Sequence, residues 1–445
     1  MGGKERIGVG VRGAGTVGGG VIRELQLHGQ EWGIELRGVA VENPSKPDRE
    51  FKGPHYTTGK DLLSDDLIRI IVEAPGGVTP EDSRDFMLDA MDSGRSVVTP
   101  AKAPIALFAP GLFEAARSRS VDLKFEGTVG GGIPVINPML ERVKVDRIQE
   151  IKGIVNGTTN YMLTEMARKV KEGKKRGISF KSVLNEAIKV GYAETNPADD
   201  IEGRDVAYKL AIMSMLGFRS WVDPKSISTR GITDITPADL EFASEYITDE
   251  AINGHTIKLL AIAKRSKDDD SIELRATPAL ISNDHQLARI SGVFNAVYLD
   301  WELAGPQMIT GRGAGREATT SAVLDDLKRA KDNLETGPDE IPSLDQAIQR
   351  KNPQDVVIAG YVRMYLKHIP GSAGIAYTIL GLDDGLNLKD ISQKEKFKKI
   401  VNGEVYKTDI VTFEPIEQWK VDRAIIALRK SDRVTEHPVF IPFEE

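Results

Sequence analysis

Cysteine is absent from this sequence of 445 residues. Without it the chain can form no disulfide bridge, thiol nucleophile, iron–sulfur cluster or zinc site with cysteine ligands. Histidine is scarce as well, because the six histidines are scattered and include no HxH or HExxH pair. A histidine-rich metal site is therefore not expected, and the chemistry must depend on lysine, carboxylates, backbone amides or a cofactor.

A positive net charge and long apolar runs are missing too. Lys and Arg number 59 against 66 Asp and Glu, which leaves no general basic field for nucleic acid or an anionic membrane surface. No apolar run approaches the ~20 residues that a bilayer span needs. The N-terminus leads at once into a Gly-rich apolar run and offers no secretory signal. We expect a soluble, cytoplasmic protein of about three domains, with neither a nucleic-acid nor a membrane partner.

Strand and helix patterns alternate in the first part of the chain. Short β-rich runs lie at residues 7–13, 34–41, 68–77 and 95–104, with helical patterns at 15–29 and 80–94. Alternation of this kind predicts an α/β fold with a doubly wound parallel sheet. Much later, the charged segment 331–355 has the composition of a linker.

A GxGxxG motif directly follows the first expected strand and opens the first expected helix. It consists of Gly13, Ala14, Gly15, Thr16, Val17 and Gly18. Gly13 allows a tight turn, Gly15 lets the backbone approach a pyrophosphate, and Gly18 permits close helix–strand packing. Amides at the start of the helix, at Thr16 and Val17, then hold the negative charge. We expect a Rossmann-like dinucleotide-binding domain, and the alternative is a Gly-rich turn that binds nothing.

The end of the second expected strand bears on the choice of cofactor. Glu42 lies there and can bind a ribose 2′-hydroxyl while repelling a 2′-phosphate. Lys46 and Arg49 follow closely and could neutralise that repulsion, so NAD is favoured over NADP only slightly. Arg12, at the end of the first strand, either borders the cofactor or is a surface charge.

Two lysines are candidates for the group that takes the hydroxyl proton of an alcohol substrate. Lys102 follows an expected strand, at the carboxyl edge where open α/β sheets bind ligands. Lys209 lies four residues after Asp205, on the same face of an expected helix. An ordinary solvated or paired lysine is the alternative for each.

Acidic residues gather shortly before Lys209. They are Glu194, Asp199, Asp200, Glu202 and Asp205. Such a cluster is either a solvated loop or a site for a cation or an ammonium group. Upstream, Asn156 or Thr158 can cap a helix whose free amides would accept a carboxylate. Together with the dinucleotide loop and the lysines, these features predict oxidation of an amino acid or an amino-alcohol.

Several segments between residues 5 and 330 resemble, in order, those of the homoserine dehydrogenase family. They read GAGTVGGGV, TPAKAPIA, EGTVGGGIPVI, GIVNGTTNYML, GYAETNPADDIEGRDVAYKLAI, GVFNAV and GRGAGREATTSAVLDDL. The resemblance implies reversible NAD(P)-dependent oxidation of L-homoserine to L-aspartate 4-semialdehyde, on the way to threonine and methionine. It also implies a homodimer or a homotetramer.

The resemblance implies roles for individual residues. Lys209 matches the general acid/base of the family, and Lys102 a second catalytic lysine near nicotinamide and substrate. The positions that match the substrate site are Glu194, Asp205, Asp200, Gly157, Thr158 and Tyr192. The positions that match the cofactor site are Gly13, Gly15, Thr16, Val17, Gly18, Glu42, Pro75, Gly76, Lys102, Gly313 and Gly315.

Members of the family also carry a monovalent cation, usually sodium, held by a carboxylate and main-chain carbonyls. The matching positions here are Glu126, Val129, Gly131 and Ile133. A Gly-rich hinge without an ion is the alternative, because carbonyl-built sites leave little side-chain signature.

Three features depart from the family pattern. Ala101 precedes the loop lysine where Asn is usual, and Arg312 stands where the late glycine loop usually has Pro. Glu42 stands where an Arg is frequent, so the resemblance leaves the choice between NAD and NADP open.

The resemblance divides the chain into four parts. Residues 1–135 form the dinucleotide-binding domain (completed by about 305–330), 136–304 an α+β substrate-binding, catalytic and dimerisation domain, 331–355 a linker, and 356–445 an ACT-like βαββαβ domain. The last part contains a Pro370-Gly371 turn like that of ACT domains. Either it binds an amino-acid effector or it serves only for oligomerisation.

Two other functions remain open at this stage. The same fold could oxidise another hydroxy amino acid or alcohol, and activity across alcohols with NAD would distinguish that case. A non-catalytic NAD or amino-acid sensor is the second, although both lysines and the substrate acids are present.

Overall fold

The computed structural model describes residues 6–41, 53–173, 179–248, 251–383, 385–401 and 404–444. The chain forms two compact units, each drawn from several stretches of sequence. Unit 1 comprises Met1–Val155, Ala207–Ile227 and Phe294–Ile348, and unit 2 comprises Asn156–Val206, Ser228–Val293 and Gln349–Glu445. These units group the chain differently from the expected domains, because residues 136–304 contribute to both and residues 356–445 belong to unit 2.

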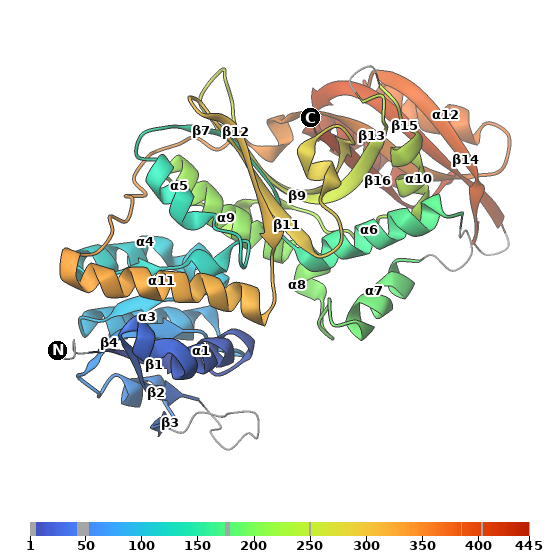
Figure 1. Cartoon of the computed structure of the whole chain (residues 1–445). Helices are drawn as coiled ribbons and strands as arrows, with labels where there is room; N and C mark the ends of the chain where they lie inside the picture. The colour runs from blue at the N-terminus through green and yellow to red at the C-terminus, as the bar shows by residue number, and fades with distance from the viewer. Residues whose placement is uncertain are drawn as a thin grey trace. The chain divides into compact units, whose positions relative to one another are not determined.

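A six-stranded sheet in the order β3-β2-β1-β4-β5-β6 forms the centre of unit 1 (Figure 1). Its strands are β1 (Ile7–Arg12), β2 (Ile34–Ala40), β3 (His55–Tyr56), β4 (Ile68–Glu73), β5 (Ser96–Val98) and β6 (Leu123–Lys124). Every neighbouring pair is parallel. The doubly wound parallel sheet expected from the sequence is thereby confirmed.

Five helices of unit 1 contact this sheet: α1 (Thr16–Trp32), α2 (Gly59–Leu62), α3 (Pro80–Asp92), α4 (Lys102–Arg119) and α11 (Arg316–Thr336). Unit 1 also contains α5 (Ile136–Arg142) and, from Ala207 on, α9 (Arg204–Phe218). Although it is encoded late, α11 lies beside α1 (Figure 1), where buried Val323 and Leu327 pack with Val21 and Leu25. Since α11 ends at Thr336, the first residues of the expected linker are helical.

Three more strands of unit 1 form an antiparallel group in the order β12-β11-β7. They are β7 (Ile148–Ile154), β11 (Phe294–Trp301) and β12 (Gly305–Arg312). The β11–β12 hairpin has an unbroken register from Phe294↔Arg312 to Trp301↔Gly305, and its last strand leads directly into the glycine loop before α11.

Unit 2 joins a long hairpin to the C-terminal sheet. Its strands are β8 (Ser228–Thr229), β9 (His255–Arg265), β10 (Ile272–Ser282), β13 (Val357–Lys367), β14 (Leu388–Val401), β15 (Glu404–Glu417) and β16 (Val434–Glu444). Their order is β9-β10-β16-β13-β15-β14, with β8 also paired to β10. The sequence did not predict the β9–β10 hairpin, whose strands are buried on both faces and show no clear alternation.

The helices of unit 2 are α6 (Gly157–Lys171), α7 (Phe180–Lys189), α8 (Ala198–Ile201), α10 (Pro237–Glu245), α12 (Ser372–Thr378) and α13 (Gln418–Lys430). From β13 onward the chain runs strand–helix–strand–strand–helix–strand, the βαββαβ order expected for residues 356–445. Its own core includes Val362, Phe413 and Leu428. Across the described part of the chain, no helix combines the length and the apolar character that crossing a membrane requires.

Candidate active site

Each of the three glycines of the dinucleotide motif is required for a different structural reason. Gly13 has a φ of 94°, and a Cβ there would lie 2.3 Å from the Ala74 carbonyl oxygen. A Cβ on Gly18 would lie 2.1 Å from the Gly13 carbonyl oxygen, so α1 packs tightly on the end of β1. At Gly15 a Cβ would meet nothing within 4 Å. Gly15 therefore leaves open space beside the first turn of α1, as a pyrophosphate requires.

A pocket of about 680 Å³ opens beside this loop. Gly13, Gly15, Val41, Pro75 and Gly76 are among the residues that line it. Strand order reverses between β1 and β4, and open α/β sheets bind ligands in the crevice outside the strand ends at such a point. Glu42, the expected ribose ligand, lies outside the described residues.

Lys102 is the first residue of α4, directly after the loop that follows β5. The Thr99 hydroxyl shapes this loop, since it donates to the Glu73 carbonyl at 2.7 Å and accepts from the Ala101 amide at 3.0 Å. Ala101 caps α4 without a side-chain hydrogen bond. The half-buried Lys102 thus lies at the carboxyl edge of the parallel sheet, where the sequence placed it.

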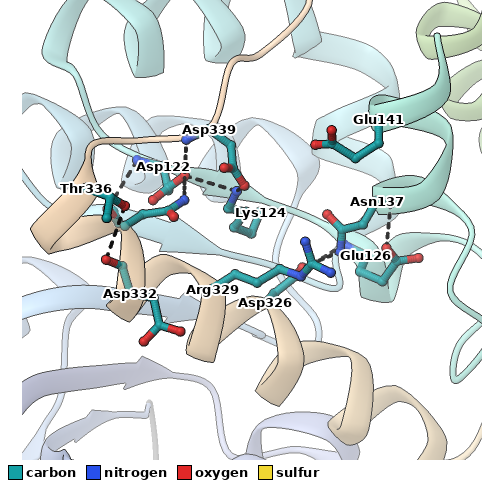
Figure 2. A network of polar contacts seen from close by, with 12 residues as sticks. Asp122, Lys124, Glu126, Asn137, Glu141, Asp326, Arg329, Asp332, Thr336 and Asp339 are labelled. Atoms are coloured by element: carbon teal, nitrogen blue, oxygen red, sulfur yellow. Dashed lines mark hydrogen bonds and ion pairs between the residues drawn. The ribbon is translucent and has the colours of Figure 1, made fainter. Parts of the chain in front are cut away.

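Glu126 and Asp326 form a buried polar centre beneath the expected cation loop (Figure 2). The Glu126 carboxylate accepts the backbone amides of Val135, Ile136 and Asn137 at 2.6–2.8 Å. Asp326 accepts the Glu126 amide at 2.7 Å and the Asn137 side-chain amide at 3.1 Å. Burial raises the pKa of Glu126, and it raises the pKa of Asp326 to about 7.

The oxygens left over in this loop are carbonyls. Among the described residues, no hydrogen bond is donated to the carbonyls of Val129, Gly131 or Ile133, all of which are buried residues. The described residues contain no group of three or more carboxylates and histidines that could hold a metal ion. A cation here would therefore be bound by backbone oxygens, while Glu126 is occupied by amides.

The late glycine loop packs against the cation loop. A Cβ on Gly131 would lie 2.5 Å from the Gly313 carbonyl oxygen, and the Gly132 amide donates to the Arg312 carbonyl at 3.1 Å. A Cβ on Gly313 would lie 1.9 Å from Cγ of Asn295. Gly315, with a φ of 111°, caps α11 and faces open space.

Lys209 lies on α9, four residues after Asp205. Its Nζ donates to the carbonyl of Val155 at 2.7 Å, just beyond the end of β7. The side chain is half-buried, and this contact holds its ammonium group at one place in unit 1.

In unit 2 the centre of the expected substrate site is Asn156. Its Oδ1 accepts the Thr159 amide at 2.9 Å and so caps α6. Its Nδ2 donates to Asp200 at 2.7 Å and to Asp205 at 2.8 Å. The structure thereby brings two of the expected acids to the start of one helix. Sequence reasoning named Asn156 only as a possible cap and missed this second role.

Other expected substrate residues lie at the same helix start. The Thr158 hydroxyl donates to the Tyr192 carbonyl at 2.8 Å. A Cβ on Gly157 would lie 2.9 Å from the Val293 carbonyl oxygen, so only glycine fits there comfortably. Glu194 is exposed and makes no hydrogen bond or ion pair within the described stretches of the chain.

The remaining acids of the cluster belong to a surface network. Arg204 binds Asp199 at 2.7 Å and also contacts Glu202. All three side chains are about half exposed or more. The acidic residues therefore fall into different groups, and of these only Asp200 and Asp205 bind Asn156.

Comparison with known proteins decides the family. The family model described as "Homoserine dehydrogenase" matches residues 134–327, and "Homoserine dehydrogenase, NAD binding domain" matches residues 13–126. The homoserine dehydrogenase of Synechocystis is 36% identical over 382 residues, which covers 82% of this chain and 84% of that protein. The chain belongs to the homoserine dehydrogenase family. Its relative from Pseudomonas aeruginosa is 34% identical with 98% of each chain covered.

Solved structures of homoserine dehydrogenases agree with this assignment. That from Thiobacillus denitrificans matches 99% of this chain and 98% of its own, with a TM-score of 0.84 and 32% identity. The chain is thus an oxidoreductase, and the matched NAD-binding domain contains the glycine loop described above.

One buried group of the homoserine dehydrogenase fold was not assigned a role from the sequence. Asn295, in the GVFNAV segment, is fully buried, and neither atom of its side-chain amide has a partner among the described residues. It lies against Gly313 of the late glycine loop, and the cation loop packs against the same glycine through Gly131. An unpaired buried amide is costly, and only its position beside two functional loops distinguishes it from a packing residue.

Proposed function

We propose that the chain oxidises L-homoserine reversibly to L-aspartate 4-semialdehyde with a nicotinamide dinucleotide. The Asn156 cluster carries the proposal, because one amide side chain caps α6 and also binds Asp200 and Asp205. The free amides of a helix start suit the substrate carboxylate, and the two aspartates suit its ammonium group. Homoserine presents both groups on one carbon atom. Gly157, Thr158, Tyr192 and Glu194 complete the proposed substrate site.

Lys209 is the general acid/base in this proposal. In its neutral form it takes the hydroxyl proton of homoserine, and it returns that proton in the reverse direction. The contact with the Val155 carbonyl restricts where its Nζ can lie. Lys102 acts as the second lysine, toward substrate and nicotinamide. A bound nicotinamide supplies the hydride acceptor.

NAD is the slightly favoured cofactor. Among the described residues that line the nucleotide pocket, Asp82, Asp85 and Asp89 outnumber the cations Arg12 and Lys60. A 2′-phosphate would meet this negative surface at a cost. A mutant homoserine dehydrogenase from a hyperthermophilic archaeon was solved in complex with NADPH, and it matches 73% of this chain with a TM-score of 0.59 and 22% identity. That match supports a nicotinamide cofactor, whereas the preference for NAD over NADP is argued from the charges of the pocket.

A monovalent cation, sodium by family resemblance, is proposed for the loop before α5. The carbonyls of Val129, Gly131 and Ile133 fit this role because they accept no hydrogen bond from the described residues. Hard cations prefer such oxygens. Glu126 supplies negative charge nearby and its own carbonyl. We further propose a homodimer or homotetramer, with an amino-acid effector or an oligomer contact at the ACT-like C-terminal segment.

The first test is the absorbance of reduced nicotinamide when purified protein meets L-homoserine with NAD or NADP at alkaline pH. Lys209→Ala should lower kcat by roughly 10²–10⁴-fold, while NADH binding is kept. Lys225→Ala, which replaces an exposed lysine of the same unit, is the matched control. Wild-type turnover in the Lys209 variant would remove its proposed role. Tight NADH binding without homoserine oxidation would shift the substrate to another alcohol or the protein to a sensor.

A further inference from the structure

The two strands that flank the switch point of the parallel sheet end in opposite charges. Arg12 is the last residue of β1, Glu73 is the last residue of β4, and the two are direct register partners. Nη1 of Arg12 donates to Oε1 of Glu73 at 3.0 Å. A cation is thereby fixed at the point of the sheet where the nucleotide pocket opens.

The surroundings of Glu73 make it a weak counterion for Arg12. Glu73 is completely buried, and the Ser83 hydroxyl donates to the same carboxylate oxygen at 2.7 Å. Its other oxygen has no partner among the described residues. Burial raises the pKa of Glu73 to about 8, so near neutral pH it carries only part of a negative charge.

Asp82 is therefore the main counterion. It lies in the first turn of α3 and binds Nη2 of Arg12, the second arm of the guanidinium group. The Phe86 ring lies 4.6 Å from the guanidinium carbon, and a Cβ on Gly59 would touch both Phe86 and Arg12. Arg12 is thus held flat between α3 and the start of α2, with only 14% of its side chain exposed.

This arrangement also orients Arg12 toward the ligand. Arg12, Gly59, Asp82 and Phe86 all line the nucleotide pocket together with Gly13 and Gly15. The other described cation of the lining, Lys60, is 84% exposed and lies 4.0 Å from Asp89. Of the two described cations in the pocket lining, Arg12 is consequently the more tightly held, and both of its Nη atoms already bind a carboxylate.

We propose that Asp82 determines cofactor specificity by holding Arg12 away from a 2′-phosphate. The inference rests on the proposed function only in requiring that a nicotinamide dinucleotide occupies this pocket. With Asp82 in place, both Nη atoms of Arg12 bind carboxylates, and a 2′-phosphate meets the Asp82 carboxylate instead. Removal of that one charge would free a fork of N–H donors that matches a phosphate group.

Asp82→Asn is the direct test, because Asn keeps the shape of the side chain and only its backbone amide contributes to the cap of α3. Isothermal titration with NADH and NADPH reads binding without homoserine. We expect NADPH to bind about tenfold more tightly in the variant, as for one gained hydrogen bond between charged groups, with little change for NADH. Because no turnover is needed, failure of the homoserine assay and failure of this proposal remain distinguishable.

Asp85→Asn is the matched control for the loss of one pocket charge, and it should raise NADPH binding less than Asp82→Asn does, because it leaves Arg12 paired. Asp85 lines the same pocket and is 62% exposed, against 52% for Asp82, but its partner is Arg84. The double variant Arg12→Met/Asp82→Asn should lose the gain in NADPH binding. The double variant Arg12→Lys/Asp82→Asn should lose it as well, and its lysine keeps a positive charge beside Glu73. An unchanged NADPH-to-NADH ratio in Asp82→Asn overturns the proposal. So does an equal gain in Asp85→Asn, or a gain that persists without Arg12.

Discussion

Asp326→Asn tests the buried polar centre beneath the cation loop (Figure 2). The Asp326 side chain is fully buried on α11, and burial raises its pKa from the ordinary 3.8 to about 7. Between these two values the folded chain keeps a proton that the unfolded chain has released. The free energy of unfolding therefore falls as the pH rises through this window, and the loss is complete above about pH 7.

The magnitude follows from the width of the window. Each unit of pKa difference corresponds to ~1.4 kcal/mol, so about three units set an upper limit of about 4 kcal/mol. From about pH 5 to about pH 7 the wild-type chain should lose about 2–3 kcal/mol through this residue. Asn does not titrate and can still accept the Glu126 amide, while a flip of the Asn137 amide restores the other hydrogen bond.

Urea denaturation of both proteins at several pH values in this range measures the effect. Relative to wild type, Asp326→Asn should become more stable by about 2–3 kcal/mol on going from about pH 5 to about pH 7. Asp325→Asn is the control, since its side chain is 60% exposed and binds Arg329 at 3.2 Å. Parallel pH profiles for wild type and Asp326→Asn would refute the reasoning, because Asp326 would then titrate alike in the folded and unfolded chain.

Two further predictions concern other parts of the chain. Lys258→Met should cost about 1–3 kcal/mol in urea denaturation, because Lys258 is buried and its loss leaves the Ile290 carbonyl (2.6 Å) and Asn160 (3.0 Å) without this donor. The exposed Lys267→Met is its control, and equal stability of the two variants would contradict the expectation. Replacing sodium by choline at constant ionic strength should lower Tm by about 2–4 °C for each ~1 kcal/mol of cation binding lost. A Tm that does not change between the two salts would argue against the carbonyl-built site.

The nucleotide loop could be predicted from the sequence because the contacts that require its glycines are local. Each glycine is required by close contact with backbone a few residues away or with the adjacent strand, as Gly18 is by its contact with Gly13. The parallel sheet followed from the same kind of signal, a regular alternation of strands and helices. The β9–β10 hairpin was missed because strands buried on both faces lack the alternation that marks a half-exposed strand.

From spacing alone the acid cluster could be predicted only as a group, and it was the family resemblance that singled out Glu194, Asp200 and Asp205. Sequence spacing brought the acids between 194 and 205 together but could not separate Asp200 and Asp205 from Asp199 and Glu202. What separates them is distance along the chain: Asn156 lies 44 residues from Asp200 and 49 from Asp205, whereas Arg204 is a near neighbour of the other pair. Each acid can therefore bind either a nearby arginine or a distant amide, and only the folded structure determines which of the two it binds.

The expected linker shows the same limit. Its composition is typical of a solvent-exposed linker, yet one of its early residues binds to the parallel sheet. Lys124 at the end of β6 binds both Asp122 and Asp339, and the Asp339 amide donates to Asp122 at 3.1 Å (Figure 2). Because Lys124 is only 6% exposed, its charge requires these partners, although 215 residues separate it from Asp339.

Arg12 extends this argument to function. A charged residue at the end of a buried strand must have a partner, because an uncompensated charge there would cost several kcal/mol. From the sequence, Arg12 was expected either to border the cofactor or to be a surface charge, and its partners were not predicted, because they lie 61 and 70 residues away, on β4 and α3. Both carboxylates bind Arg12, and in the proposal the contact with Asp82 is the one that presents a neutral pair to the cofactor. Under the proposal for Asp82, the property that a GxGxxG motif leaves open, the choice between NAD and NADP, depends on contacts that only the folded chain creates.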